Sequence, residues 1–193
     1  MNRLSGNEKP QVHRLFVAAP LPHHVRDTIE QWTHTLKEQL VFRKWTHPQD
    51  YHITLQFLGD VVESNIETVK EALRTVNGAP IELVLSEAGA FGKAEAPRVL
   101  WAGVSDQQKG LNEWYMNIVQ ATSLLGFVPE DRPYSPHITV ARTYKGEKRI
   151  SEPLNTLAPF PTGVSWQADH IVLMRTHMNK SPMYEVVERF PKL

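Results

Sequence analysis

Two short stretches of the chain repeat one pattern: a histidine, an apolar residue, a threonine and a second apolar residue. They are His-Ile-Thr-Leu at 52–55 and His-Ile-Thr-Val at 137–140, with the histidines 85 positions apart. In an extended strand, side chains at i and i+2 point to the same face, so each copy presents an imidazole beside a hydroxyl. The apolar residues between and after them would face the core. We therefore expect two strands that form a cleft with two acid–base groups and two hydroxyl donors.

The side chains of the two motifs suit acid–base catalysis of a displacement at phosphorus. Imidazole titrates near neutral pH, so one of His52 and His137 can accept a proton while the other, protonated, donates one. In an in-line displacement, one histidine would activate the attacking oxygen and the other would protonate the leaving oxygen. The hydroxyls of Thr54 and Thr139 can donate to non-bridging phosphate oxygens. Arg142, at the end of the second strand, adds a positive charge that can reach the cleft from its rim.

The composition excludes several other kinds of site. The 193 residues include 21 acidic and 21 basic side chains, so the net charge gives no sign of a general polyanion binder. The absence of Cys excludes disulfides, thiolate nucleophiles and Cys-based zinc sites. No His-Glu-x-x-His, P-loop or Gly-x-Ser-x-Gly motif occurs, so we expect neither a metal nor another cofactor.

The same sequence gives no sign of a membrane or secreted protein. No apolar run approaches the roughly 20 residues that span a bilayer. The polar segment 1–11 lacks the apolar centre of a signal peptide, so we expect a cytoplasmic protein. We interpret 1–11 as a flexible N-terminal extension and 12–193 as a single domain.

Hydrophobic periodicity predicts the elements that position the two motifs. We expect helices over about 23–40 and 107–125, and a third that is capped by Ser64, with Glu67 in a capping box, and stopped at Gly78. The long polar segment 143–163 should be a loop with one short helix. Strands are expected at 12–19, 41–45, 51–58, 81–85, 98–104, 137–142, 165–175 and 184–190. This order predicts an α+β fold with two similar halves, each of which contributes one His-x-Thr strand.

The surroundings of the two motifs resemble a known family. Phe57-Leu58-Gly59 follows the first motif and Ser135-Pro136 precedes the second. With the stretches 15–18, 91–92, 97–101, 132–142 and 184–190, they make the chain resemble the 2H phosphoesterase superfamily. Within it, the chain is similar to the RNA 2′,3′-cyclic phosphodiesterase family, also called 2′-5′ RNA ligase or LigT-like. The resemblance covers nearly the whole chain from about Arg14.

The resemblance implies a bilobal α+β fold, in which two antiparallel-sheet lobes carry helices on the outside and one motif each toward a central cleft. It implies hydrolysis of an RNA 2′,3′-cyclic phosphate to a 2′-phosphomonoester without a metal. We expect a monomer whose partner is RNA. His52 would be the proton donor to the departing 3′ oxygen and His137 the base that acts on water. Some members also join RNA ends through a 2′-5′ linkage. Gln56 stands where a basic residue is common, which can alter RNA contacts.

Two aromatic residues complete the candidate substrate site. Tyr134, beside the second motif, can stack on a nucleobase. Phe57 is either a core residue or a second stacking platform, and we include both residues among the candidates for substrate binding. Other readings stay open: a phosphodiesterase for another small cyclic phosphate or a 2′-5′ oligonucleotide, or a non-catalytic RNA-end binder. The motifs are too alike for the residues themselves to decide which histidine is the acid.

Overall fold

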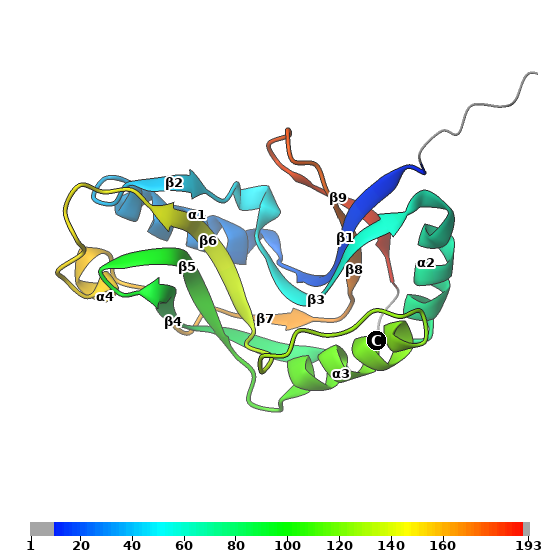
Figure 1. Ribbon diagram of the computed structural model, residues 1–193. Helices are drawn as coiled ribbons and strands as arrows, with labels where there is room; N and C mark the ends of the chain where they lie inside the picture. The colour runs from blue at the N-terminus through cyan, green and yellow to red at the C-terminus, as the bar shows by residue number, and fades with distance from the viewer. Residues whose placement is uncertain (1–9, 191–193) are drawn as a thin grey trace, which may run out of the picture.

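The computed structural model describes residues 10–190 and contains nine strands in one antiparallel sheet (Figure 1). The strands are β1 Val12–Pro20, β2 Phe42–Trp45, β3 His52–Val62, β4 Ile81–Lys93, β5 Ala96–Ser105, β6 His137–Tyr144, β7 Ser165–Ala168, β8 Val172–Thr176 and β9 Tyr184–Arg189. The helices are α1 His23–Lys37, α2 Ile66–Arg74, α3 Gly110–Ser123 and the short α4 Leu154–Leu157. Two 3-10 turns, η1 Pro48–Asp50 and η2 Glu63–Asn65, precede β3 and α2.

The sheet consists of two lobes that meet at one residue pair. Its order is β7-β4-β5-β6-β3-β1-β8-β9, and β2 pairs with β6 along the edge that β3 also uses. Only Ile53 and Ile138 pair β3 with β6, whereas every other neighbouring pair of strands is joined by several residues. In Figure 1 the lobe of β2, β5 and β6 lies on the left and that of β1, β8 and β9 on the right. The predicted bilobal α+β fold is therefore confirmed, and each lobe supplies one motif.

The lobes do not correspond to the two halves of the chain. β1 lies beside β3, but the chain then crosses to α1 and β2 before it returns to β3. The predicted single strand over 165–175 is wrong for the same reason. It is interrupted over 169–171, so that β7 pairs with β4 at one end of the sheet and β8 pairs with β1 in the other lobe.

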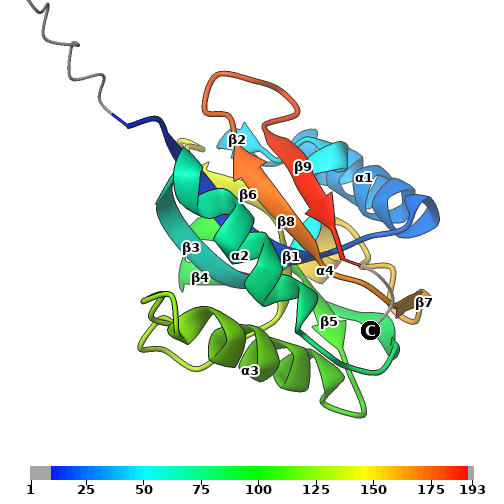
Figure 2. The same ribbon diagram turned by 90° about the vertical axis from the view of Figure 1, so that its right-hand side faces the viewer.

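Helices cover both lobes and close the core. Trp32 of α1 packs edge-on against Phe160, with ring centroids 4.8 Å apart, and its indole N–H donates to the Ala158 carbonyl. α2 and α3 lie side by side, as Figure 2 shows, and α3 contacts β3. The buried Trp114 of α3 donates its indole N–H to the carbonyl of Ala79. Trp32 and Trp114 thus bury their rings while their indole N–H groups are satisfied.

Two further predictions about element boundaries are wrong. The strand predicted to end at 85 continues to Lys93 as β4 and forms one long hairpin with β5. The absence of a side chain at Gly89 permits this, since a Cβ atom there would lie 2.1 Å from the Trp101 ring. Ser64 does not cap α2 either. It lies in η2, its hydroxyl contacts the Asn65 side chain, and the helix begins without a side-chain cap.

Most of the expected N-terminal extension lies outside the described residues, so its flexibility and the assignment of 12–193 as one domain stay predictions. Between residues 10 and 190, no helix has the length and apolar character needed to cross a membrane.

Candidate active site

The two motif strands are neighbours, and their apolar residues form the link between the lobes. Ile53 lies opposite Ile138, and both are fully buried. Leu55 and Val140, the last residues of the two motifs, are also buried. The prediction that these four side chains face the core is confirmed.

The polar residues of both motifs consequently lie on the opposite face, which lines the cleft. With Ile53 opposite Ile138 in an antiparallel pair, His52 lies across from Thr139, and Thr54 lies across from His137. The two histidines are then diagonal neighbours, which in an antiparallel pair are separated by roughly 7 Å. That spacing leaves room for one phosphate group between the two imidazoles.

A backbone carbonyl fixes each imidazole in the same way. His52 Nδ1 lies 2.7 Å from the Asp50 carbonyl oxygen, and His137 Nδ1 lies 2.8 Å from that of Ser135. A carbonyl can only accept, so in each neutral ring Nδ1 carries the proton and Nε2 offers a lone pair. The Thr54 hydroxyl lies 3.1 Å from Nε2 of His52 and donates to it in this state. Both histidines are therefore held as proton acceptors at Nε2.

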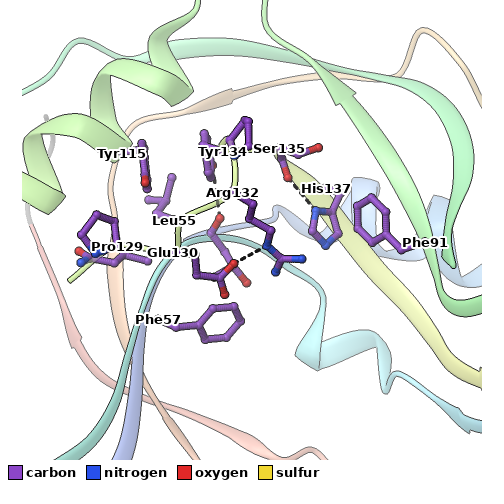
Figure 3. A pocket seen from close by; sticks show the side chains of 13 residues that line it. Leu55, Phe57, Phe91, Tyr115, Pro129, Glu130, Arg132, Tyr134, Ser135 and His137 are labelled. Carbon is purple, nitrogen blue, oxygen red and sulfur yellow. Dashed lines mark hydrogen bonds and ion pairs between the residues drawn. The ribbon is translucent and has the colours of Figure 1, made fainter. Parts of the chain in front are cut away.

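Aromatic rings surround the histidines and limit their contact with water. The His52 ring contacts the rings of Phe16 and Tyr184, with centroid distances of 4.9 and 5.1 Å, and these two rings also contact each other. The ring of Phe91 stands edge-on to His137 at 4.9 Å, and Figure 3 shows these two side chains together. Such packing restricts the rotation of each imidazole, so its Nε2 keeps one direction.

Burial sets the charge state of both histidines. It lowers the pKa of His52 from its ordinary 6.5 to about 4, although the hydrogen bond to Asp50 and the Asp50 charge oppose this shift. The positive charges of Arg142 and His137 lower the pKa of His52 further. Burial also lowers the pKa of His137, and the charge of Arg142 adds to that effect. Near pH 7 both imidazoles are neutral in the free protein.

A β-bulge follows the threonine in both motif strands. In β3, Val17 pairs with Gln56 and Ala18 with Thr54, so Leu55 is an extra residue. In β6, an equivalent bulge leaves one extra residue, at 140. One extra residue reverses the alternation of side chains beyond it. The fifth residue after each histidine, which regular alternation would send to the core, therefore returns to the cleft face.

Arg142 is the residue that the second bulge brings into the site. It is exposed, and its charge acts on both His52 and His137. Within residues 10–190, neither the Arg142 guanidinium nor the Thr139 hydroxyl takes part in a hydrogen bond or ion pair. Lys44 lies opposite Arg142 in the pair of β2 and β6 and brings a second positive charge to this edge.

The first bulge decides the places of Phe57 and Gln56. Phe57 is 52% exposed and lies 5.9 Å from the Phe16 ring, so its interpretation as a core residue is wrong. Gln56 is only 4% exposed, and its side-chain oxygen accepts a hydrogen bond from Thr122 of α3. The suggestion that Gln56 alters RNA contacts stays a prediction, since its largely buried side chain is held by Thr122 while the residue still borders the pocket beside His137.

A pocket of about 140 Å³ opens beside His137 and Thr54. Figure 3 shows Phe57, Phe91, Tyr115 and Tyr134 among its walls. Tyr134 stacks in parallel on Tyr115, with centroids 4.5 Å apart, and donates its hydroxyl to the Thr54 carbonyl at 3.3 Å. One face of the Tyr134 ring is thus already covered by protein.

Arg132 and Glu130 form an ion pair at the same pocket, and both are exposed. The charge of Arg132 lowers the pKa of His137 and that of Glu130 raises it. The pocket thus combines the four aromatic rings with one charged pair close to the proposed reaction centre.

Several residues of this site carry no local sequence signal. Tyr184 and Phe91 come from distant segments and meet the histidines only through the fold, and Lys44 reaches Arg142 in the same way. Among the residues that the structure describes, no three His, Asp or Glu side chains gather as metal ligands.

Comparison with known proteins shows which family this chain is similar to. The model of the family described as LigT like Phosphoesterase matches residues 19–101 and 103–184, and each matched segment contains one His-x-Thr motif. An RNA 2′,3′-cyclic phosphodiesterase of Geobacillus stearothermophilus is 40% identical over 181 residues, which are 92% of this chain and 57% of that protein. The chain thus spans little more than half of that relative. The protein of the same name from Bacillus subtilis (strain 168) is 34% identical over 91% of this chain and 94% of its own length.

Solved structures share the fold. A crystal structure of Escherichia coli LigT complexed with 3′-AMP superposes with a TM-score of 0.77 over 94% of this chain and 99% of that one, at 23% identity. A protein of Thermus thermophilus gives a TM-score of 0.72 over 93% of this chain and 97% of its own, at 26% identity. The Escherichia coli structure, at this low identity, shows a common fold alone.

Proposed function

Since the chain belongs to the LigT-like phosphoesterase family, we propose that it hydrolyses the 2′,3′-cyclic phosphate at an RNA 3′ end to a 2′-phosphomonoester. The two histidines whose Nε2 atoms lie on one face of β3 and β6 are the observation that carries this proposal. Each has its Nδ1 tied to a carbonyl, so each has one nitrogen available for proton transfer. A two-histidine reaction at phosphorus requires two such nitrogens, one that accepts a proton and one that donates a proton.

The reaction proceeds by attack of water on phosphorus and departure of the 3′ oxygen. Nε2 of His137 accepts a proton from the attacking water as the new P–O bond forms. The P–O3′ bond breaks, and a protonated His52 donates its Nε2 proton to O3′. The product keeps phosphate on O2′ and has a free 3′ hydroxyl. The resemblance to the family supports this assignment of acid and base.

The bound phosphate supplies the charge that the acid needs. In the free protein, burial keeps the pKa of His52 near 4, so the imidazolium form is scarce at neutral pH. A negatively charged phosphate beside Nε2 favours the imidazolium and raises that pKa. It also offsets the Arg142 charge, which acts in the opposite direction. Substrate binding thus prepares the acid, and the base reaction requires His137 to remain in the neutral form that burial and the Arg142 charge favour in the free protein.

Thr54, Thr139 and Arg142 are the proposed phosphate ligands. Once His52 is protonated, the Thr54 hydroxyl no longer donates to its Nε2 and can turn to a phosphate oxygen. Thr139 lies opposite His52, and its hydroxyl is free of protein partners within residues 10–190. Arg142 can bind two phosphate oxygens at once, as planar guanidinium groups do.

Phe57 and Tyr134 are the proposed contacts for the terminal nucleoside. Phe57 presents an exposed ring on the cleft side of β3, which suits stacking on a base. Tyr134, with one face on Tyr115, contributes a wall of the adjoining pocket. We further propose that the protein acts as a cytoplasmic monomer, and light scattering after size-exclusion chromatography tests its oligomeric state.

Hydrolysis of a cyclic-phosphate-ended oligonucleotide in the presence of EDTA tests the function. We expect turnover that survives chelation, with phosphate on O2′ as read by ³¹P NMR. His52→Ala and His137→Ala should abolish it, whereas His34→Ala, at an exposed position of α1, should not. A panel with other cyclic phosphates, 2′-5′ oligonucleotides and 5′-hydroxyl RNA separates the remaining substrates and the ligase reaction. Retention of the oligonucleotide without product would instead support an RNA-end binder.

A further inference from the structure

Asp50 is a buried carboxylate at the entrance to β3. It is 2% exposed and is the last residue of η1. Its carboxylate accepts backbone N–H groups from the other end of the chain: Met183 at 2.9 and 3.1 Å, and Tyr184 at 3.0 Å. A buried charge needs such partners, because without them its burial would be strongly unfavourable. Asp50 therefore fixes the start of β9, and the end of the loop over 177–183 seen at the top of Figure 1, against η1.

The same residue also holds His52. The Asp50 carbonyl accepts the Nδ1 proton of His52 at 2.7 Å, two residues further along the chain. Tyr184, whose N–H is bound by the Asp50 carboxylate, places its ring edge-on to the His52 ring at an interplanar angle of 85°. Two independent contacts to the imidazole, a hydrogen bond and a ring contact, thus depend on one residue.

We propose that Asp50 is a positioning residue that couples the start of β9 to His52, and so fixes the direction of His52 Nε2 in the cleft. The inference rests on the proposed function, because it assigns His52 a reacting nitrogen. Its physical basis is separate: a buried carboxylate joins segments 133 residues apart and orders the ring that confines the imidazole. Misplacement of a catalytic group by about 1 Å can cost on the order of 100-fold in rate.

Asp50→Asn is the direct test, since it keeps the size of the side chain but replaces one acceptor oxygen by a donor that faces a backbone N–H. We expect kcat for the cyclic phosphate to fall by about 10- to 100-fold with KM nearly unchanged. Asp106→Asn is the matched control. Asp106 likewise accepts two backbone N–H groups, from Gln108 and Leu111 at the start of α3, but does not contact His52. Its variant should lose stability with kcat unchanged.

A titration of the His52 ring by NMR provides a readout that needs no activity. The charged and titratable groups that face His52 are Asp50, Arg142, His137 and Tyr184. Removal of the Asp50 charge leaves the positive neighbours unopposed, so His52 should titrate at lower pH in Asp50→Asn and not in Asp106→Asn. If the two variants differ in this way but the wild-type protein hydrolyses no cyclic phosphate, the proposed function fails while the positioning role stands.

Two results would overturn the inference. One is an Asp50→Asn variant with wild-type kcat and an unchanged His52 titration; the other is an equal loss of kcat in Asp106→Asn. If Asp50→Asn does not fold, Tyr184→Leu carries the test, because it removes the ring contact and leaves the backbone hydrogen bond. A wild-type kcat in that variant would contradict the coupling through β9.

Discussion

The depressed pKa of His52 makes the stability of the protein depend on pH in a definite direction. Burial lowers this pKa from 6.5 to about 4 in the folded state. In the unfolded chain the ring is in water and titrates near its ordinary value. Between these two values the unfolded chain binds a proton that the folded protein does not bind. The free energy of unfolding should therefore be highest above about pH 6.5 and should fall as the pH drops toward 4.

The size of the effect follows from the two pKa values. At about pH 5 the unfolded ring is almost fully protonated and the folded ring mostly neutral, which lowers the free energy of unfolding by about 2 kcal/mol relative to about pH 7.5. His137 adds to this loss, because burial lowers its pKa as well. Urea denaturation followed by circular dichroism, at a series of pH values between these limits, measures the change.

The His52→Asn variant isolates the contribution of this ring. Asparagine keeps a donor close to the Asp50 carbonyl but cannot titrate, so the loss of stability between about pH 7.5 and 5 should shrink by about 2 kcal/mol. His34→Asn, at an exposed site on α1, should keep the wild-type dependence. Parallel curves for the wild type and His52→Asn would refute the reasoning, because they would mean that burial does not disfavour the charged ring.

The remaining predictions concern catalysis and substrate binding. His52→Ala and His137→Ala should each lower kcat by about 10²–10⁴-fold, whereas Thr139→Ala should leave measurable activity with a raised KM; steady-state kinetics separate these results. A substrate whose leaving group needs no protonation should restore turnover to the His52 variant and not to the His137 variant, and the opposite pattern would exchange the two roles. Arg142→Ala should raise the pKa of both histidines, because a positive charge is lost, and should weaken inhibition by inorganic phosphate; NMR titration and inhibition constants measure both effects. Phe57→Ala should raise KM for an oligonucleotide substrate but not for ribose 2′,3′-cyclic phosphate, which has no base to stack, and an equal effect on both would argue against stacking.

The sequence by itself was sufficient for the fold class, the family and the two motif strands. Alternation of apolar and polar residues is a local property, and it correctly placed Ile53 and Ile138 in the core and the histidines on the other face. The duplication of the motif made the pairing of two acid–base groups a reasonable expectation. These features could be predicted because each depends on neighbours within a few residues.

Only the tertiary structure decided what lies beside the histidines. The bulges after Thr54 and Thr139 depend on how β3 pairs with β1 and β6 with β5, which no local pattern records. They reverse the alternation, so Phe57 and Arg142 reach the cleft, and Gln56, next to Phe57, is buried.

The same limit applies to the contacts that hold His52. Asp50 meets Tyr184 across 134 residues, and the crossing of the chain between lobes splits the expected strand over 165–175 into β7 and β8. A buried carboxylate is recognisable only once its backbone partners are in place, because its sequence neighbours do not reveal its burial. Short sequence motifs therefore determine which groups can react, whereas the pKa values and the orientation of these groups depend on long-range packing.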